Sequence, residues 1–255
     1  MGRKKGPQGL MTIIEHLEEL RRVLVISAIA FVAAAGGLMF FADRILRFML
    51  VPLYRVHISV IQIRPMEYLF VLLKISTVGG LILALPVLLW QAWGFIKPAL
   101  QPREGRLVFA TVPVIVVLFL GGVVFGYFTV YQVALKFIVL LGRGVVMPYI
   151  SISEYVDFTI SFLLPFGFIF EMPVLAIILT RLGLISPSYL ARQRKYAFFL
   201  TVVLAIVLIP DPSLFTQSLL ALPMYLLFEV SILLSRIVER RRQAVVASQA
   251  LPAQR

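Results

Sequence analysis

The sequence predicts an all-α integral membrane protein with six transmembrane helices, and three observations support this prediction. Of the 255 residues, 61% are hydrophobic and only 14% are charged, which is far from the composition of a soluble domain. Residues 23–42, 75–96 and 107–135 contain no charged side chain at all. Each of these segments reaches the length of about 20 residues that a helix needs to cross the hydrocarbon core of a bilayer.

Three further spans complete the predicted set. The six spans are placed at residues 23–42, 75–96, 107–131, 158–180, 196–210 and 213–235. The last two are short, so flanking polar turns or a locally thinner bilayer would have to accommodate them. We expect residues 1–236 to form a single membrane domain and residues 237–255 to form a disordered cytoplasmic tail.

Local signals predict where the segments between spans begin and end. Charged and apolar residues alternate over residues 43–68, which predicts short amphipathic helices on the outer surface, interrupted at Pro52. The spacing of Ser151 and Glu154 predicts a capping box that starts the helix of the fourth span. Gly183 is expected to end that helix, and the Ser186-Pro187 pair to begin the next one.

The distribution of positive charge predicts the orientation. With six spans the two termini share one side, and that side carries most of the lysine and arginine residues outside the spans. By the positive-inside rule, both termini are expected to be cytoplasmic. The net charge of +12 is therefore mostly a topology signal, and no nucleic-acid partner is predicted because no binding module is visible.

Composition leaves enzyme chemistry poorly supported. The chain has no cysteine and only two histidines, His16 and His57, neither of which is placed to act as a base inside the membrane. The aspartates fall in outer loops or at span ends, and no phosphate-binding loop is present. We therefore predict no enzyme activity, no cofactor and no metal.

Glu171 is the main anomaly, because it lies well inside the apolar run of the fourth span, between Pro165 and Pro173. An ionisable group near the middle of a spanning helix costs about 2.5–3.5 kcal/mol on insertion scales. This cost favours a functional or partner-contacting role, although a bound proton or a hydrogen bond to a neighbouring helix is the simpler explanation. Tyr127, in the third span, is either a core residue or a polar group facing a cavity.

Four acidic residues lie on the cytoplasmic side amid basic ones. Glu15 is expected to belong to a capping box, and Glu18 can pair with Arg22 one turn later. Glu19 has no such partner four residues on, and Glu104 lies between two arginines. Carboxylates in this setting either pair internally or capture a cationic ligand.

Several separated motifs then point to one family. They are His16-Leu-Glu-Glu-Leu-Arg21, Gln91-Ala-Trp-Gly-Phe-Ile-Lys-Pro-Ala-Leu100 with Glu104, Phe166-Gly-Phe-Ile-Phe-Glu-Met-Pro173, Arg194-Lys-Tyr196, and Pro210-Asp211 with Gln217 and Pro223. Over about residues 12–236, in order and spacing, these motifs resemble the TatC family, the multispan receptor subunit of the twin-arginine protein translocase. The outer turn departs from the family pattern, with one residue more between Asp211 and Gln217.

The resemblance implies a fold and a function. The fold would be six helices in a curved, glove-like bundle in a bacterial-type cytoplasmic membrane. The protein would bind twin-arginine signal peptides of folded cargo proteins. It would also organise TatA- and TatB-type single-span membrane proteins into an oligomeric complex that the proton-motive force drives.

The resemblance also implies roles for individual residues. Glu19 and Glu104 would meet the paired arginines of the signal peptide, in a site shaped by Leu20, Arg21, Phe95 and Pro98. The expected partner-contacting or intramembrane polar residues are Glu171, Tyr127 and Gln217. The expected structural or assembly residues are Pro52, Asp211 and Pro173.

Two alternatives remain open. One is a proton- or ion-coupled secondary transporter of a small solute that uses Glu171. The other is a structural membrane scaffold in which the carboxylates serve only as pairs and caps.

Overall fold

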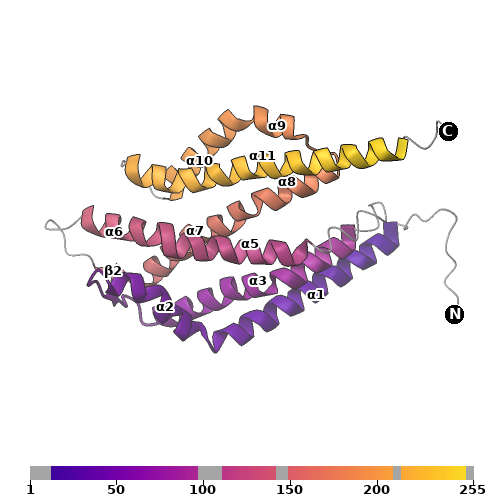
Figure 1. Ribbon diagram of the computed structural model, residues 1–255. Helices are drawn as coiled ribbons and strands as arrows, with labels where there is room; N and C mark the ends of the chain where they lie inside the picture. The colour runs from indigo at the N-terminus through magenta and orange to yellow at the C-terminus, as the bar shows by residue number, and fades with distance from the viewer. Residues whose placement is uncertain (1–12, 97–110, 142–148, 209–213, 251–255) are drawn as a thin grey trace, which may run out of the picture. The chain divides into compact units, whose positions relative to one another are not determined.

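A computed structural model describes residues 13–96, 111–141, 149–208 and 214–250, and these residues are almost entirely helical (Figure 1). The helices are α1 (Ile13–Met39), α2 (Ala42–Tyr54), α3 (Glu67–Ile96), α5 (Val112–Phe125), the π-helix η2 (Gly126–Tyr131), α6 (Gln132–Leu141), α7 (Ile152–Phe170), α8 (Met172–Arg181), α9 (Pro187–Arg192), α10 (Arg194–Leu208) and α11 (Leu214–Ala250). Two short strands, β1 (Val60–Ile61) and β2 (Ile150–Ser151), accompany them. The prediction of an all-α membrane protein is confirmed.

Five segments of the described chain are long and apolar enough to cross a membrane. They are Ile14–Met39, Glu67–Phe95, Val112–Lys136, Ile152–Arg181 and Gln217–Arg240. Residues 196–208 of the predicted span at 196–210 lie in α10, whose 15 residues are fewer than a crossing ordinarily needs. Residues 209 and 210 lie outside the described residues. The count of six spans therefore stays a prediction. The last helix, α11, runs on to Ala250 and so extends into the segment that the sequence assigns to a tail.

The chain divides into two compact units, one formed by Met1–Asp43 with Leu72–Val112 and the other by Arg44–Val71 with Pro113–Arg255. In the first unit α1 and α3 lie side by side (Figure 1). A Cβ atom added at Gly80 would lie 2.5 Å from the Cα atom of Ala35, closer than real contacts allow. The two helices can approach this closely because small residues occupy their contact, as in other membrane helix pairs.

In the second unit α11 packs against both α8 and α10. The fully buried side chains of this unit include Phe162 and Phe166 of α7 and Leu220 and Ile232 of α11. Helix α2 is amphipathic, as predicted for this segment: Leu46, Met49, Leu50 and Leu53 are buried, and Phe48 and Tyr54 on its other faces are exposed. This spacing of three to four residues is that of one helical face.

The predicted local signals at three helix ends are confirmed. Ser151 is the N-cap of α7, and its side chain accepts hydrogen bonds from the backbone N–H groups of Ser153 and Glu154. Gly183 follows the end of α8 with a φ of 73°, a left-handed conformation that glycine adopts without strain. Ser186 caps α9, whose first residue is Pro187.

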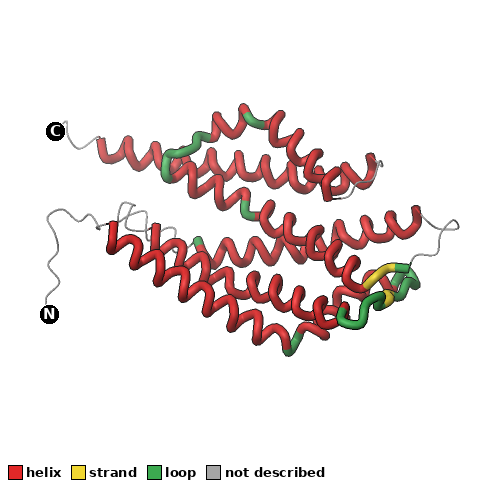
Figure 2. The backbone as a smooth tube through the Cα atoms, turned by 180° about the vertical axis from the view of Figure 1, so that it is seen from behind, coloured by secondary structure: helices red, strands yellow, loops and turns green. Residues whose placement is uncertain are grey.

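A buried carboxylate, Glu67, holds the strand pair and the adjoining helix starts together. Strands β1 and β2 pair in parallel, with Val60 opposite Ile150, and lie side by side in Figure 2. One oxygen of Glu67 accepts hydrogen bonds from the N–H groups of Ile63 and Arg64, at 2.6 and 3.0 Å. Its other oxygen accepts from the Ser151 hydroxyl and from the N–H of Ser153 at 3.1 Å. Glu67 is only 6% exposed, so water does not solvate its carboxylate. The four donors stabilise the charge in place of water.

Replacing Glu67 with alanine is predicted to lower the thermal unfolding midpoint of the detergent-solubilised protein by at least about 4 °C, because four donors lose their acceptor. Glu154→Ala is the matched control, since Glu154 is an exposed acid in the first turn of α7, next to the Ser153 N–H that Glu67 binds. Equal shifts for the two variants in a thermal melt would contradict this role of Glu67.

Candidate functional site

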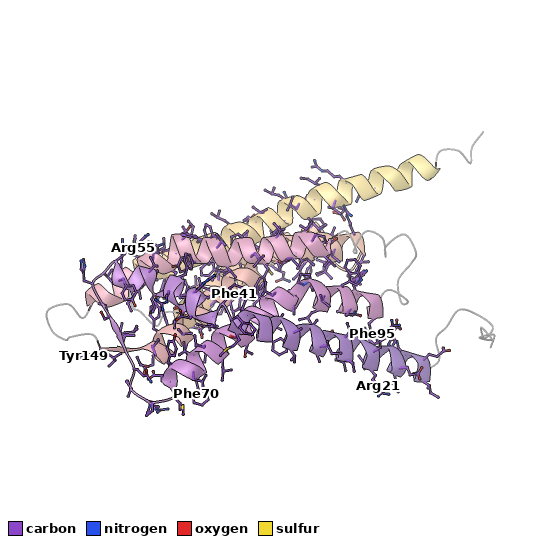
Figure 3. All side chains as sticks on the ribbon, turned by 90° about the horizontal axis from the view of Figure 1, so that it is seen from below. Arg21, Phe41, Arg55, Phe70, Phe95 and Tyr149 are labelled. Carbon is purple, nitrogen blue, oxygen red and sulfur yellow. The ribbon has the colours of Figure 1, made fainter. Side chains whose placement is uncertain are left out.

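The first turns of α1 and the last turn of α3 meet in the first unit. The imidazole ring of His16 stacks on the ring of Phe95, with 4.3 Å between the ring centroids and 15° between the planes. Figure 3 shows Arg21 and Phe95 on the adjoining ends of these two helices. Glu19 lies one turn after His16, so the stack brings Phe95 close to the turn of α1 that carries Glu19. The structure thus assembles the α1 and α3 parts of the predicted binding site.

Glu19 has a buried, unpaired carboxylate oxygen. Its side chain is partly buried, and the Oε2 atom has no hydrogen-bond partner among the described residues. Leu20 beside it is partly buried, and Arg21 is exposed. Removing a carboxylate oxygen from water without supplying a hydrogen-bond donor is unfavourable in free energy. Glu19 is therefore a candidate binding site for a cationic group. Pro98 and Glu104, the other predicted members of this site, lie outside the described residues.

Glu171 lies between helices α7 and α8, which together form the candidate span Ile152–Arg181. Helix α7 ends at Phe170 and α8 begins at Met172. Pro173 has no N–H, so the regular hydrogen bond to the carbonyl of Ile169 cannot form. The N–H of Glu171 instead donates to the carbonyl of Phe168 at 3.1 Å, three residues back. The helix is therefore interrupted for one residue at Glu171.

The Glu171 side chain is buried, with only 8% of it exposed. Neither carboxyl oxygen makes a regular hydrogen bond in the described part of the chain. The backbone of Phe119 in α5 acts on this carboxyl group, so a contact with a neighbouring helix, the simpler explanation open at the outset, is retained. Carboxylates inside the membrane normally face another polar group or a water-filled space.

A close contact between α5 and α7 lies next to this break. A Cβ atom added at Gly122 of α5 would lie 2.5 Å from the carbonyl oxygen of Phe166 and 2.9 Å from the Cβ atom of Phe170. The ring of Phe125 also lies near that of Phe170, at 5.4 Å between centroids. Gly122 therefore sets the distance between α5 and the end of α7 immediately before Glu171.

The structure places Tyr127 against α2, the helix that carries Pro52. Tyr127, in η2, is 6% exposed and donates a hydrogen bond to the backbone carbonyl of Phe48 at 2.8 Å. Phe48 lies in α2, one turn before Pro52. Tyr127 is therefore a packed core residue with a specific polar contact. Gln217 is partly buried near the start of α11, whereas Asp211 lies outside the described residues.

Comparison with known proteins identifies the family. The family model described as Sec-independent protein translocase protein (TatC) matches residues 15–223. The chain belongs to the TatC family. The resemblance seen in the sequence motifs is confirmed, and the chain is a multi-pass membrane protein of the Sec-independent translocase, with a role in transport rather than catalysis.

Relatives and solved structures agree over nearly the whole chain. The TatC protein of Carboxydothermus hydrogenoformans is 39% identical over 229 residues, which cover 90% of this chain and 94% of the relative. That of Aquifex aeolicus is 38% identical over 239 residues, covering 92% and 99%. A crystal structure described as the twin arginine translocase receptor TatC superposes with a TM-score of 0.74 at 39% identity, covering 88% of this chain and 99% of that one.

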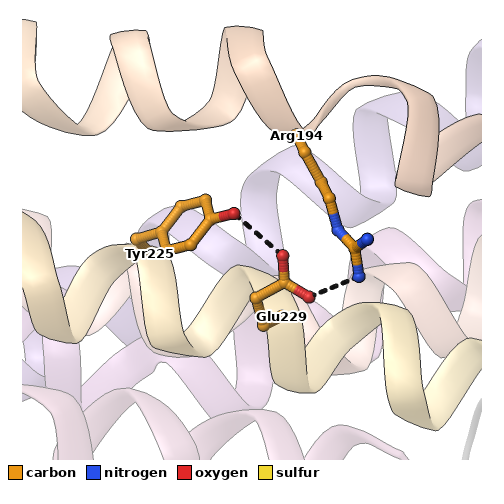
Figure 4. A network of polar contacts seen from close by, with 3 residues as sticks. All are labelled: Arg194, Tyr225 and Glu229. Carbon is orange, nitrogen blue, oxygen red and sulfur yellow. Dashed lines mark hydrogen bonds and ion pairs between the residues drawn. The ribbon is translucent and has the colours of Figure 1, made fainter.

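One polar network of this TatC-family chain was missed by sequence reasoning. Arg194 at the start of α10 donates a hydrogen bond to Glu229 of α11 at 2.8 Å, and the Tyr225 hydroxyl donates to the other oxygen of Glu229 at 2.9 Å (Figure 4). This hydrogen bond and the charge of Glu229 raise the pKa of the Arg194 guanidinium above its ordinary value. The two side chains are 45% and 27% exposed, so the pair orients α10 on α11 more than it stabilises the fold.

The sequence contains both charged residues of this network but does not indicate that they pair. Glu229 is an isolated acid in an apolar run, and Arg194 belongs to one of the family motifs, but 35 residues separate them. His16 was likewise part of a motif, yet nothing in the sequence indicated that it stacks on Phe95. Both contacts depend on helices being adjacent in space.

Substitution of Gly122 by alanine is predicted to destabilise the protein by about 1–3 kcal/mol, because the added methyl group overlaps the backbone of α7. Gly121→Ala is the matched control, since a Cβ atom there meets nothing within 4 Å. Thermal or denaturant unfolding in detergent measures the difference. A loss of stability in the Gly121 variant as large as in the Gly122 variant would refute the assigned contact.

Proposed function

We propose that this chain is the signal-peptide receptor and core subunit of a twin-arginine translocase, and that Glu19 and Glu104 bind the paired arginines of the signal peptide. The observation that carries this proposal is the buried, unpaired oxygen of Glu19. It lies one turn from the His16–Phe95 stack, in the helix turn that carries the family motif. The description of the similar crystal structures as a translocase receptor supports the same function.

The chemistry of the site suits arginine. A guanidinium group presents its N–H donors in a planar fork that matches the two oxygens of a carboxylate, which a lysine ammonium does not. The rest of the chain is strongly basic, with a net charge of +12, so few of its surfaces attract a cationic peptide. Two carboxylates grouped on such a surface would therefore select both the position and the register of the arginine pair.

The proposed receptor site faces the cytoplasm. The positive-inside rule supports cytoplasmic termini in a bacterial-type cytoplasmic membrane, and Glu19 precedes the apolar stretch of α1. Folded cargo carrying a twin-arginine signal peptide would arrive on this side.

Glu171 is proposed to serve a different step, the docking of a single-span partner of the TatA or TatB type. Its two oxygens are buried and unpaired where α7 and α8 part. A polar or cationic side chain on a partner helix would satisfy this carboxylate, and in hydrocarbon no water competes for the bond. Assembly of such partners into an oligomeric complex would then couple transport to the proton-motive force.

Glu19→Ala and Glu104→Ala are each predicted to weaken binding of a twin-arginine signal peptide about tenfold, the loss of one charge-assisted hydrogen bond of about 1.5 kcal/mol. Glu18→Ala is the control, because Glu18 is an exposed acid on the same helix turn. The measurement is photocrosslinking of a labelled signal peptide to the protein in membranes. Crosslinking that is unchanged in the Glu19 and Glu104 variants would remove the assignment.

Glu171→Leu is predicted to abolish copurification of single-span partners, whereas Glu171→Gln retains part of it, because an amide still forms hydrogen bonds across a helix contact. A photocrosslinker at position 171 should label a partner span, while one at Phe199, 68% exposed on α10, serves as the lipid-facing control. Partner recovery that is equal in the leucine variant and the unaltered protein would count against this role.

A further inference from the structure

Proline 52 leaves a backbone carbonyl of α2 without its regular partner. Pro52 lies inside α2, and a proline has no N–H to donate to the carbonyl four residues before it, which is that of Phe48. The Phe48 carbonyl therefore needs a donor from outside the regular helix pattern, because unpaired backbone carbonyls are destabilising.

The hydroxyl of Tyr127 occupies the place of that donor. It donates to the Phe48 carbonyl at 2.8 Å, across 79 residues of sequence, and the Tyr127 ring stacks on the Phe48 ring with 5.0 Å between centroids. The next carbonyl, that of Met49, accepts from the hydroxyl of Tyr155 in α7 at 2.5 Å. Two tyrosines from different helices thus bind consecutive carbonyls of α2.

The π-helix η2 is part of the same arrangement. Tyr127 and Tyr131, its second and last residues, are stacked with 5.9 Å between centroids and 12° between planes. The Tyr131 hydroxyl shares a hydrogen bond of 2.7 Å with Thr159 of α7, and does not contact α2 through its hydroxyl. The wider turn of a π-helix places both rings on one buried side of the segment.

We propose that Pro52 and Tyr127 act as one unit, in which the proline withholds a backbone donor and the tyrosine hydroxyl supplies the replacement. Tyr127 is then a positioning residue that fixes α2 against η2, and Tyr155 fixes it against α7. The broken helix bond makes α2 dependent on this contact, because the carbonyl has lost its regular partner in its own helix. This inference concerns how α2 is held and does not depend on signal-peptide binding.

The test is a double-mutant cycle on the full-length protein in detergent. Tyr127→Phe keeps both ring stacks and removes only the hydroxyl. With Pro52 present, it is expected to lower the unfolding midpoint by about 2–4 °C. When combined with Pro52→Ala or Pro52→Leu, either of which restores the N–H, it is expected to lower the midpoint by much less. An equal loss in both backgrounds overturns the proposal.

Tyr131→Phe is the matched control, since it removes a buried hydroxyl of the same π-helix that binds Thr159 and not the Phe48 carbonyl. Its effect is expected to be the same with and without Pro52.

Hydrogen exchange of the α2 amides tests the proposal without any change at Pro52. Tyr127→Phe should accelerate exchange over residues 45–54, and Tyr225→Phe, which removes a hydroxyl bonded within α11, should not. Similar exchange of α2 in these two variants overturns the proposal as well.

Discussion

The requirement that polar groups be satisfied within the protein governs this structure more than any other constraint. In a bilayer core, no water is available to bind an exposed N–H, C=O or carboxylate. Helices meet this requirement for most of the backbone, which explains why the described chain is almost entirely helical. This molecule is distinguished by the groups that satisfy its polar atoms where a helix is interrupted or begins.

At three such places, polar groups are paired through contacts that join different elements. At Pro52 the orphaned carbonyl receives a tyrosine hydroxyl. Glu67, the first residue of α3, accepts hydrogen bonds from N–H groups of the connection between β1 and α3 and from an N–H at the start of α7. At the start of α10, Glu229 of α11 receives Arg194. Each solution joins two elements, so the same bonds that satisfy the polar groups also hold the elements in place.

These cases explain which features can be predicted from the sequence. Ser151, Gly183 and the Ser186-Pro187 pair act on residues within a few positions, so their roles follow from local spacing alone. Composition predicts the class of protein for the same reason, because the length of an apolar run is a local property. One partner of Glu67, Ser151, lies 84 residues away, and the partner of Tyr127 lies 79 residues away. Burial and a polar group can be expected at such positions, but the partner depends on which helices pack together.

The same constraint applies to the acidic side chains that have no hydrogen-bond partner among the described residues. Buried side-chain atoms without such a partner include the hydroxyls of Thr180 and Ser235. These hydroxyls are neutral, so burying them unpaired costs less free energy than burying a charge. Glu19 and Glu171 are different, because each buries carboxylate oxygens where other acids of the chain, such as Glu67 and Glu229, are fully paired. The fold evidently can supply donors to a buried acid. A carboxylate held without one, at the motif near the start of α1 and between α7 and α8, therefore supports the proposal that another molecule brings the donor.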